Sequence, residues 1–552
     1  MVVAIVATIV LFLPLREGVP KAADLPDHLG TTAQFLESLR HGNLYPRWMP
    51  DFHDGMGEPT LVFYPPGLYA IASGLAWAAG GDVLFGLFAT LALFAFTGSL
   101  GMFALLRSRF GDLAAACGGL LFAAMPYRVF ELYSSGLYSA FAAGSLLPWV
   151  FAALAREADL GPAGSGRIRL GLPLLFAAVV LLNLPTALLL CYLTAFWLAV
   201  EMLSTRRWRL ARRVAISMAA GLLLAGVYLI PATLELSEIQ IPMNSRAVYT
   251  SNFLFQGERS WMSSGLRSTF DRMAIFPAIG LALGSAVLWF AGRRRDPAAW
   301  PSETMRLLLT VGATSLFLMT PISLPLWKFL PALRQVNLPW RFLEPFGSVC
   351  VAVTACALAL LLRARPIPMG VRAAGTLALL AMIWLWGVFA ASISGMNGKL
   401  SAGAARAAIV QFARKTPRGY FLAPGARPIA ELGPVPLLAC DRPCGARALE
   451  WSGTRRRFEV ETPAGTQLAV RSYFFPGWSA RRAGADSAPL PTFAEPGTGR
   501  IVIQVPPGRT EINLRFGTVP VRVLGWCVSI ATLLAVLLVW IRGRQPVSPL
   551  AT

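Results

Sequence analysis

The side chains best suited to acid–base and ligand chemistry are concentrated near the start of the chain. All three histidines, His28, His41 and His53, lie in the segment 16–81. Acidic residues accompany them, among them Asp24, Asp27, Glu37, Asp51, Asp54 and Glu58. Only 14% of the 552 residues are charged, so this density is unusual for the chain. Polar groups held beside apolar surroundings are candidates for function.

The first candidate motif is Asp24-Leu-Pro-Asp27-His28. Pro26 is typical of the first turn of a helix, and we expect that helix to continue over 28–40. Asp24 and His28 are four residues apart, so their side chains could approach each other across this turn. The alternative interpretation is structural, with Asp24 as the N-cap and Asp27 favouring the positive end of the helix.

The second candidate segment is 42–69, which is dense in aromatic residues, proline, glycine and charge. It contains Arg47, His53, Asp54 and Tyr64. Its aromatic side chains could form a belt at the membrane interface or stack on sugar rings. A belt alone does not require the adjacent His53-Asp54 pair, which favours a binding role.

A divalent cation site is one interpretation of these acidic and histidine residues. Asp27, His28, His53 and Asp54 are of the types that coordinate such ions, but their spacing matches no diagnostic pattern. The sequence therefore assigns no cofactor and leaves a divalent metal open. It also contains no Gly-x-x-x-x-Gly-Lys phosphate loop.

The third candidate group consists of cations on the predicted outer side. Arg341 lies in the segment 328–345 between two apolar runs, where the positive-inside rule disfavours cations. A guanidinium offers a planar fork of donors that matches phosphate oxygens, so we interpret Arg341 as a phosphate contact. A similar but weaker case for substrate binding applies to Arg128 together with the nearby Glu131. The alternative is that these long side chains reach from the membrane to its interface.

The composition indicates that these groups are positioned by a membrane protein. Hydrophobic residues make up 55% of the chain, and the mean hydropathy is +0.58. A soluble protein would carry about a quarter charged residues, so that class is excluded. The net charge of +21 comes from basic clusters between apolar runs, which favours anionic lipid headgroups over nucleic acid as their partner.

Twelve segments are predicted to span the membrane because a spanning helix needs about 20 mostly apolar residues. They are 2–15, 82–106, 112–127, 134–155, 170–184, 186–203, 214–234, 271–292, 304–320, 342–362, 371–392 and 521–541. The run 62–79 is interpreted as an external or re-entrant helix. Basic clusters such as Arg206–Arg213 and Arg293–Arg295 then all lie on one side, which predicts that both termini are cytoplasmic. A cleaved signal peptide is the alternative for 1–15, but no basic segment precedes it.

The segment 393–520 differs from the rest of the chain. Four stretches alternate polar and apolar residues with turn residues between them: 456–462, 467–474, 500–505 and 510–516. This pattern predicts an antiparallel β-sandwich. The predicted organisation is a polytopic helical domain at 1–392, an external β-rich domain at 393–520, and a final span with a cytoplasmic tail at 521–552.

Two of the seven cysteines, Cys440 and Cys444, lie in the predicted external domain. A disulfide between them is favoured in an oxidising compartment. A metal pair is the alternative, but it would need two more ligands, and no histidine lies nearby.

Several motifs occur in the order found in one family of membrane proteins. They are Asp24-Leu-Pro-Asp27-His28, Tyr45-Pro-Arg47-Trp48, Phe63-Tyr64-Pro65-Pro66 and Leu338-Pro339-Trp340-Arg341-Phe342. With them the chain resembles the bacterial membrane family labelled "6-pyruvoyl-tetrahydropterin synthase-related", a label that implies no pterin chemistry, and the GT-C superfamily of polytopic glycosyltransferases. The tail around Tyr473-Phe-Phe-Pro-Gly477-Trp478 is similar to the YfhO-like membrane glycosyltransferases.

This resemblance implies a GT-C-like, all-α polytopic fold and an inverting glycosyltransferase in the bacterial inner membrane. The enzyme would move a sugar from a polyprenyl-phosphate donor to an extracytoplasmic glycan, lipid or protein. Asp24 would be the catalytic base, with Asp27 as the alternative, and Arg341 would clamp the donor phosphate. The remaining candidates would orient these groups or contact the substrate: His28, Arg47, His53, Asp54, Tyr64, Arg128 and Glu131.

Two other functions are compatible with a polytopic chain. A transporter or flippase of a lipid-linked substrate would place ionisable residues in the middle of its spans and would show related halves. The sequence shows few central charges and no repeat. A non-catalytic protein of envelope assembly would act mainly through the β-rich domain.

Overall fold

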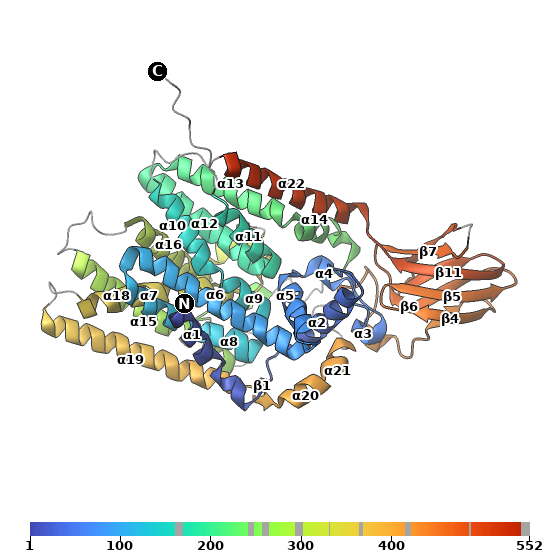
Figure 1. Ribbon diagram of the computed structural model, residues 1–552, viewed down its shortest axis with the longest axis horizontal. Helices are drawn as coiled ribbons and strands as arrows, with labels where there is room; N and C mark the ends of the chain where they lie inside the picture. Colours follow the sequence, from blue (N-terminus) through green and yellow to red (C-terminus); the bar gives the residue numbers. More distant parts are fainter. Residues whose placement is uncertain are drawn as a thin grey trace, which may run out of the picture.

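The computed structural model joins a bundle of long helices to a smaller β-rich part at one end of the bundle (Figure 1). It describes residues 1–160, 169–240, 248–256, 264–292, 302–330, 332–363, 368–414, 421–484 and 487–542. The predicted basic cluster Arg293–Arg295 and the tail after residue 542 lie outside these ranges.

Eight helical segments in the described ranges are long and apolar enough to cross a membrane. They are Val83–Phe110, Asp112–Ser135, Tyr138–Asp159, Leu184–Thr205, Arg267–Phe290, Pro339–Arg363, Met369–Ser394 and Pro520–Ile541. All eight correspond to predicted spans. The helices that form them are α6 (Val83–Phe110), α7 (Asp112–Ala123), α8 (Pro126–Phe130), α9 (Tyr138–Gly144), α10 (Leu147–Asp159), α12 (Leu184–Thr205), α15 (Ser264–Gly292), α18 (Leu343–Arg363), α19 (Met369–Ser394) and α22 (Pro520–Arg542).

Two further predicted spans are sharply bent, so the described part of the chain has up to ten crossings. Helices α13 (Trp208–Leu224) and α14 (Gly226–Leu234) meet at 75°. The segment Glu303–Leu318, within α16 (Ser302–Leu318), meets Pro321–Phe329, which contains α17 (Leu324–Phe329), at 86°. Thr320 is extended there because a residue before proline disfavours the helical conformation.

The other two predicted spans are helical but short, so the predicted count of twelve is not confirmed. Helix α1 (Val2–Phe12) has 11 residues and α11 (Gly171–Leu182) has 12. Helix α11 ends at Leu182, and the side chain of the next residue, Asn183, accepts a hydrogen bond from the Thr186 backbone at 3.0 Å and caps α12. This cap, followed by proline, separates the two helices as the sequence predicted.

Burial separates the central helix from the lipid-facing ones. The apolar stretch of Pro339–Arg363 is 94% buried, whereas that of Pro520–Ile541 is only 11% buried. Helices α19 and α22 run along opposite edges of the bundle (Figure 1). An apolar helix that exposes most of its surface is suited to a lipid environment.

Short helices form a layer between the bundle and the β-rich part (Figure 1). They are α2 (Leu25–Arg40), α3 (Phe52–Gly55), α4 (Thr60–Phe63), α5 (Gly67–Ala78), α20 (Ala402–Ala407) and α21 (Ile409–Arg414). Helix α5, from the ambiguous run 62–79, has 12 residues and belongs to this layer. The antiparallel pair of β1 (Val19–Pro20) and β2 (Lys399–Leu400) joins the first external segment to residues far along the chain.

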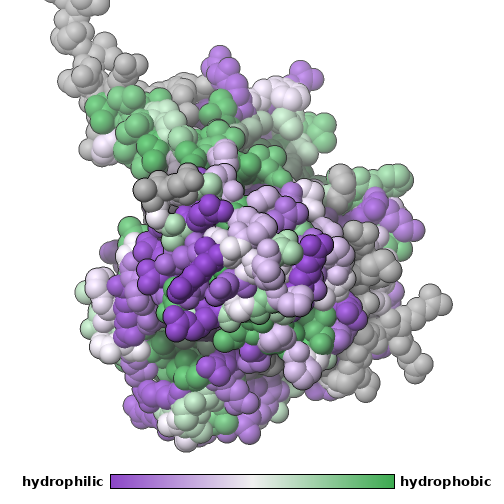
Figure 2. All heavy atoms as spheres, turned by 90° about the vertical axis from the view of Figure 1, so that its right-hand side faces the viewer, coloured by the Kyte–Doolittle hydropathy of each residue, from purple (hydrophilic) through white to green (hydrophobic). Residues whose placement is uncertain are grey.

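The β-rich part is a pair of antiparallel sheets, as predicted. One sheet has the order β3-β6-β10-β9 and the other β4-β5-β11-β7-β8. The strands are β3 (Leu438–Cys440), β4 (Gly445–Trp451), β5 (Arg455–Thr462), β6 (Thr466–Tyr473), β7 (Trp478–Arg482), β8 (Pro489–Leu490), β9 (Thr492–Ala494), β10 (Arg500–Val505) and β11 (Gly508–Phe516). Alternate residues of β5 are buried, as expected when one face covers a core. Figure 2 shows the polar surface at this end of the molecule.

A buried ion pair fastens the β-rich part to the bundle. Arg522, in the first turn of α22, donates to the Glu235 carboxylate at the end of α14 at 2.9 Å and 3.1 Å. It also donates to the Pro476 carbonyl at 2.7 Å and the Gly517 carbonyl at 3.2 Å. The guanidinium therefore ties two helices to the turn before β7 and to the end of β11.

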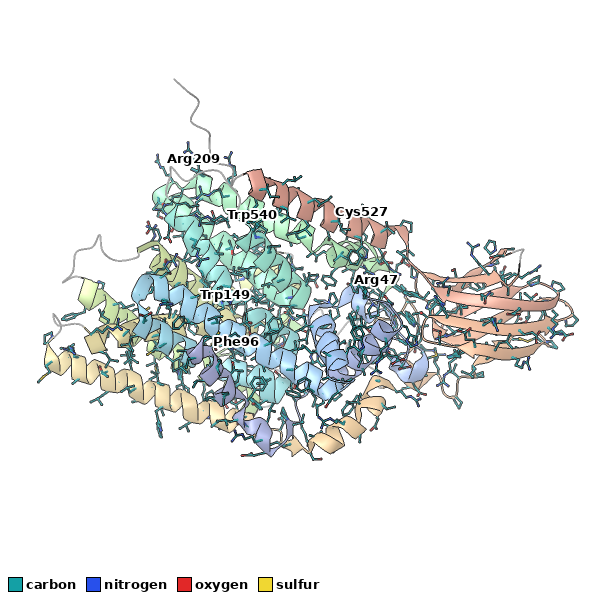
Figure 3. All side chains as sticks on the ribbon, in the orientation of Figure 1. Arg47, Phe96, Trp149, Arg209, Cys527 and Trp540 are labelled. Carbon is teal, nitrogen blue, oxygen red and sulfur yellow. A yellow bond between two sulfur atoms is a disulfide. The ribbon has the colours of Figure 1, made fainter. Side chains whose placement is uncertain are left out.

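The opposite end of the bundle carries ion pairs between helices, and Figure 3 marks this end with Arg209. The pairs include Arg213–Glu157 (3.2 Å), Arg306–Glu201 (3.2 Å) and Arg207–Glu303 (2.9 Å). The basic cluster at 206–213 thus lies at the end away from the β-rich part, as the topology prediction requires.

We expect Ser237 and Ser204, both exposed, to lie on opposite sides of the membrane. In a variant lacking the exposed Cys527, a membrane-impermeant maleimide should label Ser237→Cys in intact cells. Ser204→Cys should react only after permeabilisation. Labelling of both positions in intact cells would contradict the orientation.

Replacing Arg522 by methionine should lower the free energy of unfolding by about 3–5 kcal/mol, because Glu235 would remain as a buried, unpaired charge. Thermal unfolding of the purified protein in detergent measures the change. The double variant Arg522→Met with Glu235→Gln should recover most of the loss. An unchanged melting temperature in the single variant would show that the pair does not hold the two parts together.

Candidate functional site

Asp24 stands immediately before α2, at the N-cap position that the sequence predicted. Its backbone N–H donates to the Ser135 carbonyl at 3.0 Å. Gly136 follows with a φ of +74°, and a Cβ at that position would lie 3.0 Å from the Asp24 nitrogen. A glycine there permits both the left-handed backbone and this close approach. The start of α2 is therefore fixed against the end of the span Asp112–Ser135.

His28 lies one turn into α2 and is buried among tyrosines. Its Nδ1 is 2.9 Å from the Tyr69 hydroxyl, and its ring lies 5.0 Å from that of Tyr138. Burial lowers the pKa of His28 to about 4, against a smaller opposing effect of a hydrogen bond with the Gly136 backbone. The imidazole is therefore neutral near pH 7. It is suited to holding α2 against α5 rather than to donating a proton from a charged state.

Tyr64 lies within electrostatic reach of two predicted site residues that are far apart in the sequence. Burial raises the pKa of Tyr64, the Asp24 carboxylate raises it further, and the Arg341 guanidinium lowers it. Asp27 lies near Tyr69. Burial is the main cause of the raised pKa of Tyr69, and the Asp27 carboxylate raises it further. The fold thus brings Asp24, Tyr64 and Arg341 into one region.

Arg341 borders a cavity at the beginning of the central span. It lies in the 3₁₀ turn η9 (Pro339–Phe342), and its buried Nε has no hydrogen-bond partner among the described residues. Polar side chains of Tyr127, Glu131 and Glu344 share the cavity wall. The apolar lining comes largely from α12: Leu189, Leu190 and Leu193. A cation beside an apolar wall is suited to an anionic headgroup with a hydrocarbon tail.

Arg128 is committed to other partners inside the bundle. It donates to Glu344 Oε1 at 2.6 Å and to Ser145 Oγ at 2.6 Å. Its guanidinium also lies 4.1 Å from the centre of the Phe141 ring. Arg128 is fully buried and does not line the cavity, so Arg341 is the cation on the cavity wall among the described residues.

Glu344 is a residue that the sequence analysis missed, although it follows Arg341 by three positions. A Cβ at position 144 would collide with its carboxylate, so Gly144 leaves the space that the carboxylate fills. Glu131 is also buried, and its Oε2 has no partner in the described part of the chain. The sequence signal that could have identified Glu344 was its charge one helical turn after Arg341.

The other predicted residues from the segment 42–69 lie at the junction with the β-rich part. His53 Nε2 is 2.8 Å from Glu58 Oε2, and Asp54 pairs with Arg471 of β6 at 2.8 Å. Glu58 also accepts from the Thr60 hydroxyl at 2.6 Å. His53 and Asp54 have φ values of +54° and +53°, so the turn is held in a conformation that side chains other than glycine rarely adopt.

Arg47 lies near the same junction (Figure 3). Its guanidinium donates to the Val227 carbonyl at 2.9 Å and lies 4.2 Å from the centre of the Tyr45 ring. Arg47, His53 and Asp54 therefore connect structural parts, and the fold does not bring them to the cavity of Arg341.

The four residues named as metal ligands are not gathered either. Asp27 and His28 belong to α2, whereas His53 and Asp54 have the partners just described. No group of three or more acidic, histidine or cysteine side chains suited to a metal occurs among the described residues. Cys440 and Cys444 are joined by a disulfide.

Because His28 is buried, the free energy of unfolding should depend on pH. The unfolded chain binds a proton at this histidine near pH 6.5 and the folded chain only near pH 4, so stability should fall as the pH drops through this window. The loss should reach about 3 kcal/mol. Melting temperatures in detergent at pH 7 and pH 4.5 should differ less for His28→Gln than for the parent protein.

His41→Gln is the matched control, because His41 is exposed at the end of the same helix. It should keep the pH dependence of the parent. Equal pH dependence of all three proteins would contradict the neutral, buried state of His28.

Solved structures with a similar course of the chain include three membrane proteins. ArnT from Cupriavidus metallidurans, bound to undecaprenyl phosphate, is 16% identical over 75% of this chain and 77% of its own, with a TM-score of 0.41. The arabinofuranosyltransferase AftD from Mycobacteria is 16% identical over 71% of this chain and 26% of its own, with a TM-score of 0.41. The archaeal oligosaccharyltransferase AglB from Archaeoglobus fulgidus, in complex with an inhibitory peptide and a dolichol-phosphate, is 14% identical over 72% of this chain and 56% of its own, with a TM-score of 0.40.

No curated protein matches the sequence. The family model of the 6-pyruvoyl-tetrahydropterin synthase related domain, described as a membrane protein, matches residues 61–400. This match includes the motif around Tyr64 and the segment of Arg341 and covers more than half of the chain. The chain therefore belongs to the 6-pyruvoyl-tetrahydropterin synthase related family of membrane proteins.

Proposed function

We propose that this protein is a membrane glycosyltransferase that transfers a sugar from a polyprenyl-phosphate donor to an acceptor on the outer side of the bacterial inner membrane. The observation that carries the proposal is the position of Arg341, which borders a cavity with an apolar wall and has a buried Nε without a partner among the described residues. Asp24 and Arg341 are both close enough to Tyr64 to affect its pKa. The acceptor is an extracytoplasmic glycan, lipid or protein.

The donor phosphate fits the surroundings of Arg341. The unpartnered Nε supplies a donor for a phosphate oxygen, and a guanidinium binds such oxygens with charge-assisted hydrogen bonds. The cavity has a volume of only about 10 Å³, so the donor would have to widen it; the leucines of α12 on its wall suit a hydrocarbon chain. Arg341 lies at the start of the buried central span Pro339–Arg363, so the donor has to pass between the surrounding helices to reach it.

The transfer itself needs a base and a stabilised leaving group. The acceptor oxygen attacks the anomeric carbon while its proton passes to the Asp24 carboxylate. The bond between that carbon and the phosphate oxygen breaks, and the lipid phosphate leaves with the bonding electrons. Arg341 stabilises the negative charge on this leaving group. Attack opposite to the departing phosphate inverts the configuration of the sugar.

The tyrosine and histidine residues around Asp24 act as positioning residues. Tyr64 lies within reach of both charged groups, and the His28–Tyr69 hydrogen bond holds α2 against α5. Asp27 is the second candidate for the base because it lies in the first turn of the same helix. The β-rich part lies on the opposite side of this layer from the bundle (Figure 1).

Asp24→Asn should reduce sugar transfer by at least about 100-fold, the contribution typical of a general base. The assay uses the purified protein in liposomes with a radiolabelled polyprenyl-phosphate sugar, after envelope glycans of a deletion strain and its complement have identified the sugar and acceptor. Asp51→Asn, at an exposed aspartate outside the site, is the matched control and should retain activity. Full activity of Asp24→Asn with loss in Asp27→Asn would move the base to Asp27.

Arg341→Gln should raise the KM for the donor about 10- to 100-fold through loss of the charged hydrogen bonds, with little change in the KM for the acceptor. The donor KM of Arg341→Lys should lie between those of the parent and Arg341→Gln, because lysine keeps the charge but lacks the fork of donors. Arg334→Gln, at another arginine of the same segment, should behave like the parent. Equal donor KM values in all variants would contradict the clamp.

A further inference from the structure

Three exposed arginines lie together on the outer face of the five-stranded sheet. Arg455 of β5 stands directly opposite Arg515 of β11 in the antiparallel register. Arg515 is also opposite Ser479 of β7, and Arg481 follows two residues later on the same exposed face. We call Arg455, Arg481 and Arg515 the arginine patch.

The patch is unfavourable for the isolated domain. Like charges directly opposite each other on neighbouring strands destabilise a sheet. Other arginines of the face are neutralised, since Arg457 pairs with Glu511 at 3.3 Å and Arg509 pairs with Glu459 at 2.5 Å. The three patch arginines form no ion pair with any residue in the described ranges. Arg481 makes one neutral contact, a hydrogen bond to the Ser487 carbonyl at 3.2 Å.

The patch lies at the end of the sheet that meets the bundle. Strand β11 ends at Phe516, and α22 begins at Pro520, so at most about 17 Å of chain separates Arg515 from a predicted span. The Phe516 N–H donates to the Thr454 carbonyl at 2.9 Å, next to Arg455. A Cβ on Gly453 would lie 2.9 Å from Pro50 in the layer of short helices.

We propose that the arginine patch binds the phosphate groups of anionic phospholipids in the leaflet on the β-domain side. The interaction is independent of sugar transfer and would hold the β-rich part at a fixed height and tilt above the bilayer. Guanidinium groups bind phosphate oxygens strongly, and each basic residue near an anionic surface contributes about 1 kcal/mol. A soluble acidic polymer is the other chemistry that could bind, but the short connection to α22 favours the membrane surface.

The test measures the approach of the patch to lipid headgroups in the full-length protein. A nitroxide label at Ser479→Cys, in a Cys527→Ser background, reports collisions with a nickel-chelating headgroup lipid in nanodiscs. We expect relaxation of the label to increase at least about twofold when dioleoylphosphatidylglycerol replaces 30% of dioleoylphosphatidylcholine. Salt at 0.5 M should remove most of this increase because it screens exposed charges.

The triple variant Arg455→Gln, Arg481→Gln and Arg515→Gln should abolish the dependence on the anionic lipid. The matched control replaces Arg442, Arg447 and Arg509 by glutamine, which changes the net charge equally and should retain the dependence. Because the patch is exposed and its charges repel each other, the triple variant should elute like the parent and melt at the same or a higher temperature.

Two results would overturn the proposal. One is relaxation that does not respond to phosphatidylglycerol in the parent protein. The other is relaxation that responds to soluble dextran sulfate but not to the anionic lipid, with the response to dextran sulfate lost in the triple variant. This result would assign the patch to an acidic polymer. Sugar transfer that fails in every assay would leave the headgroup result unchanged, so the two proposals are tested separately.

Discussion

The need to pair charges inside the bundle determines how the candidate site is built. Arg128 is fully buried between helices, where an unpaired guanidinium would be costly, and Glu344 and Ser145 satisfy it at 2.6 Å each. These three residues belong to three different spans. Because Glu344 follows Arg341 by one turn, the same ion pair also fixes the segment that carries Arg341. A cation can therefore border the cavity with an unpartnered donor while its neighbour is neutralised.

Much of the architecture followed from composition and periodicity. Apolar length alone located the helices, and alternation located the strands β5, β6, β10 and β11. Apolar length also predicted α1 and α11 as spans, but these helices have only 11 and 12 residues, so the two crossings are not confirmed. The bend before Pro321 depends on local backbone geometry, and only its proline was visible in the sequence. The family predicted from the ordered motifs was confirmed by the match over residues 61–400.

The candidate site was less predictable because clustering in sequence is a poor guide to clustering in space. Asp24, His28, His53 and Asp54 lie within 31 residues of one another, yet the fold divides them between the start of α2 and the junction with β6. His53 is buried and pairs with Glu58, so this histidine stabilises a strained turn. Conversely, Asp24 and Arg341 are brought within reach of one phenol by tertiary packing, which no local pattern encodes.

The small sheet of β1 and β2 has a consequence for the order in which this protein is assembled. Val19 pairs with Leu400, and Gly30 of α2 packs so closely on Phe412 that no larger residue fits between them. During synthesis, the helix that bears Asp24 must therefore wait for nearly four hundred residues before its final neighbours emerge. Closing so long a loop is entropically expensive, so the region around Asp24 should be among the last to reach its native form. A nascent chain would thus keep this region incomplete until its bundle is complete.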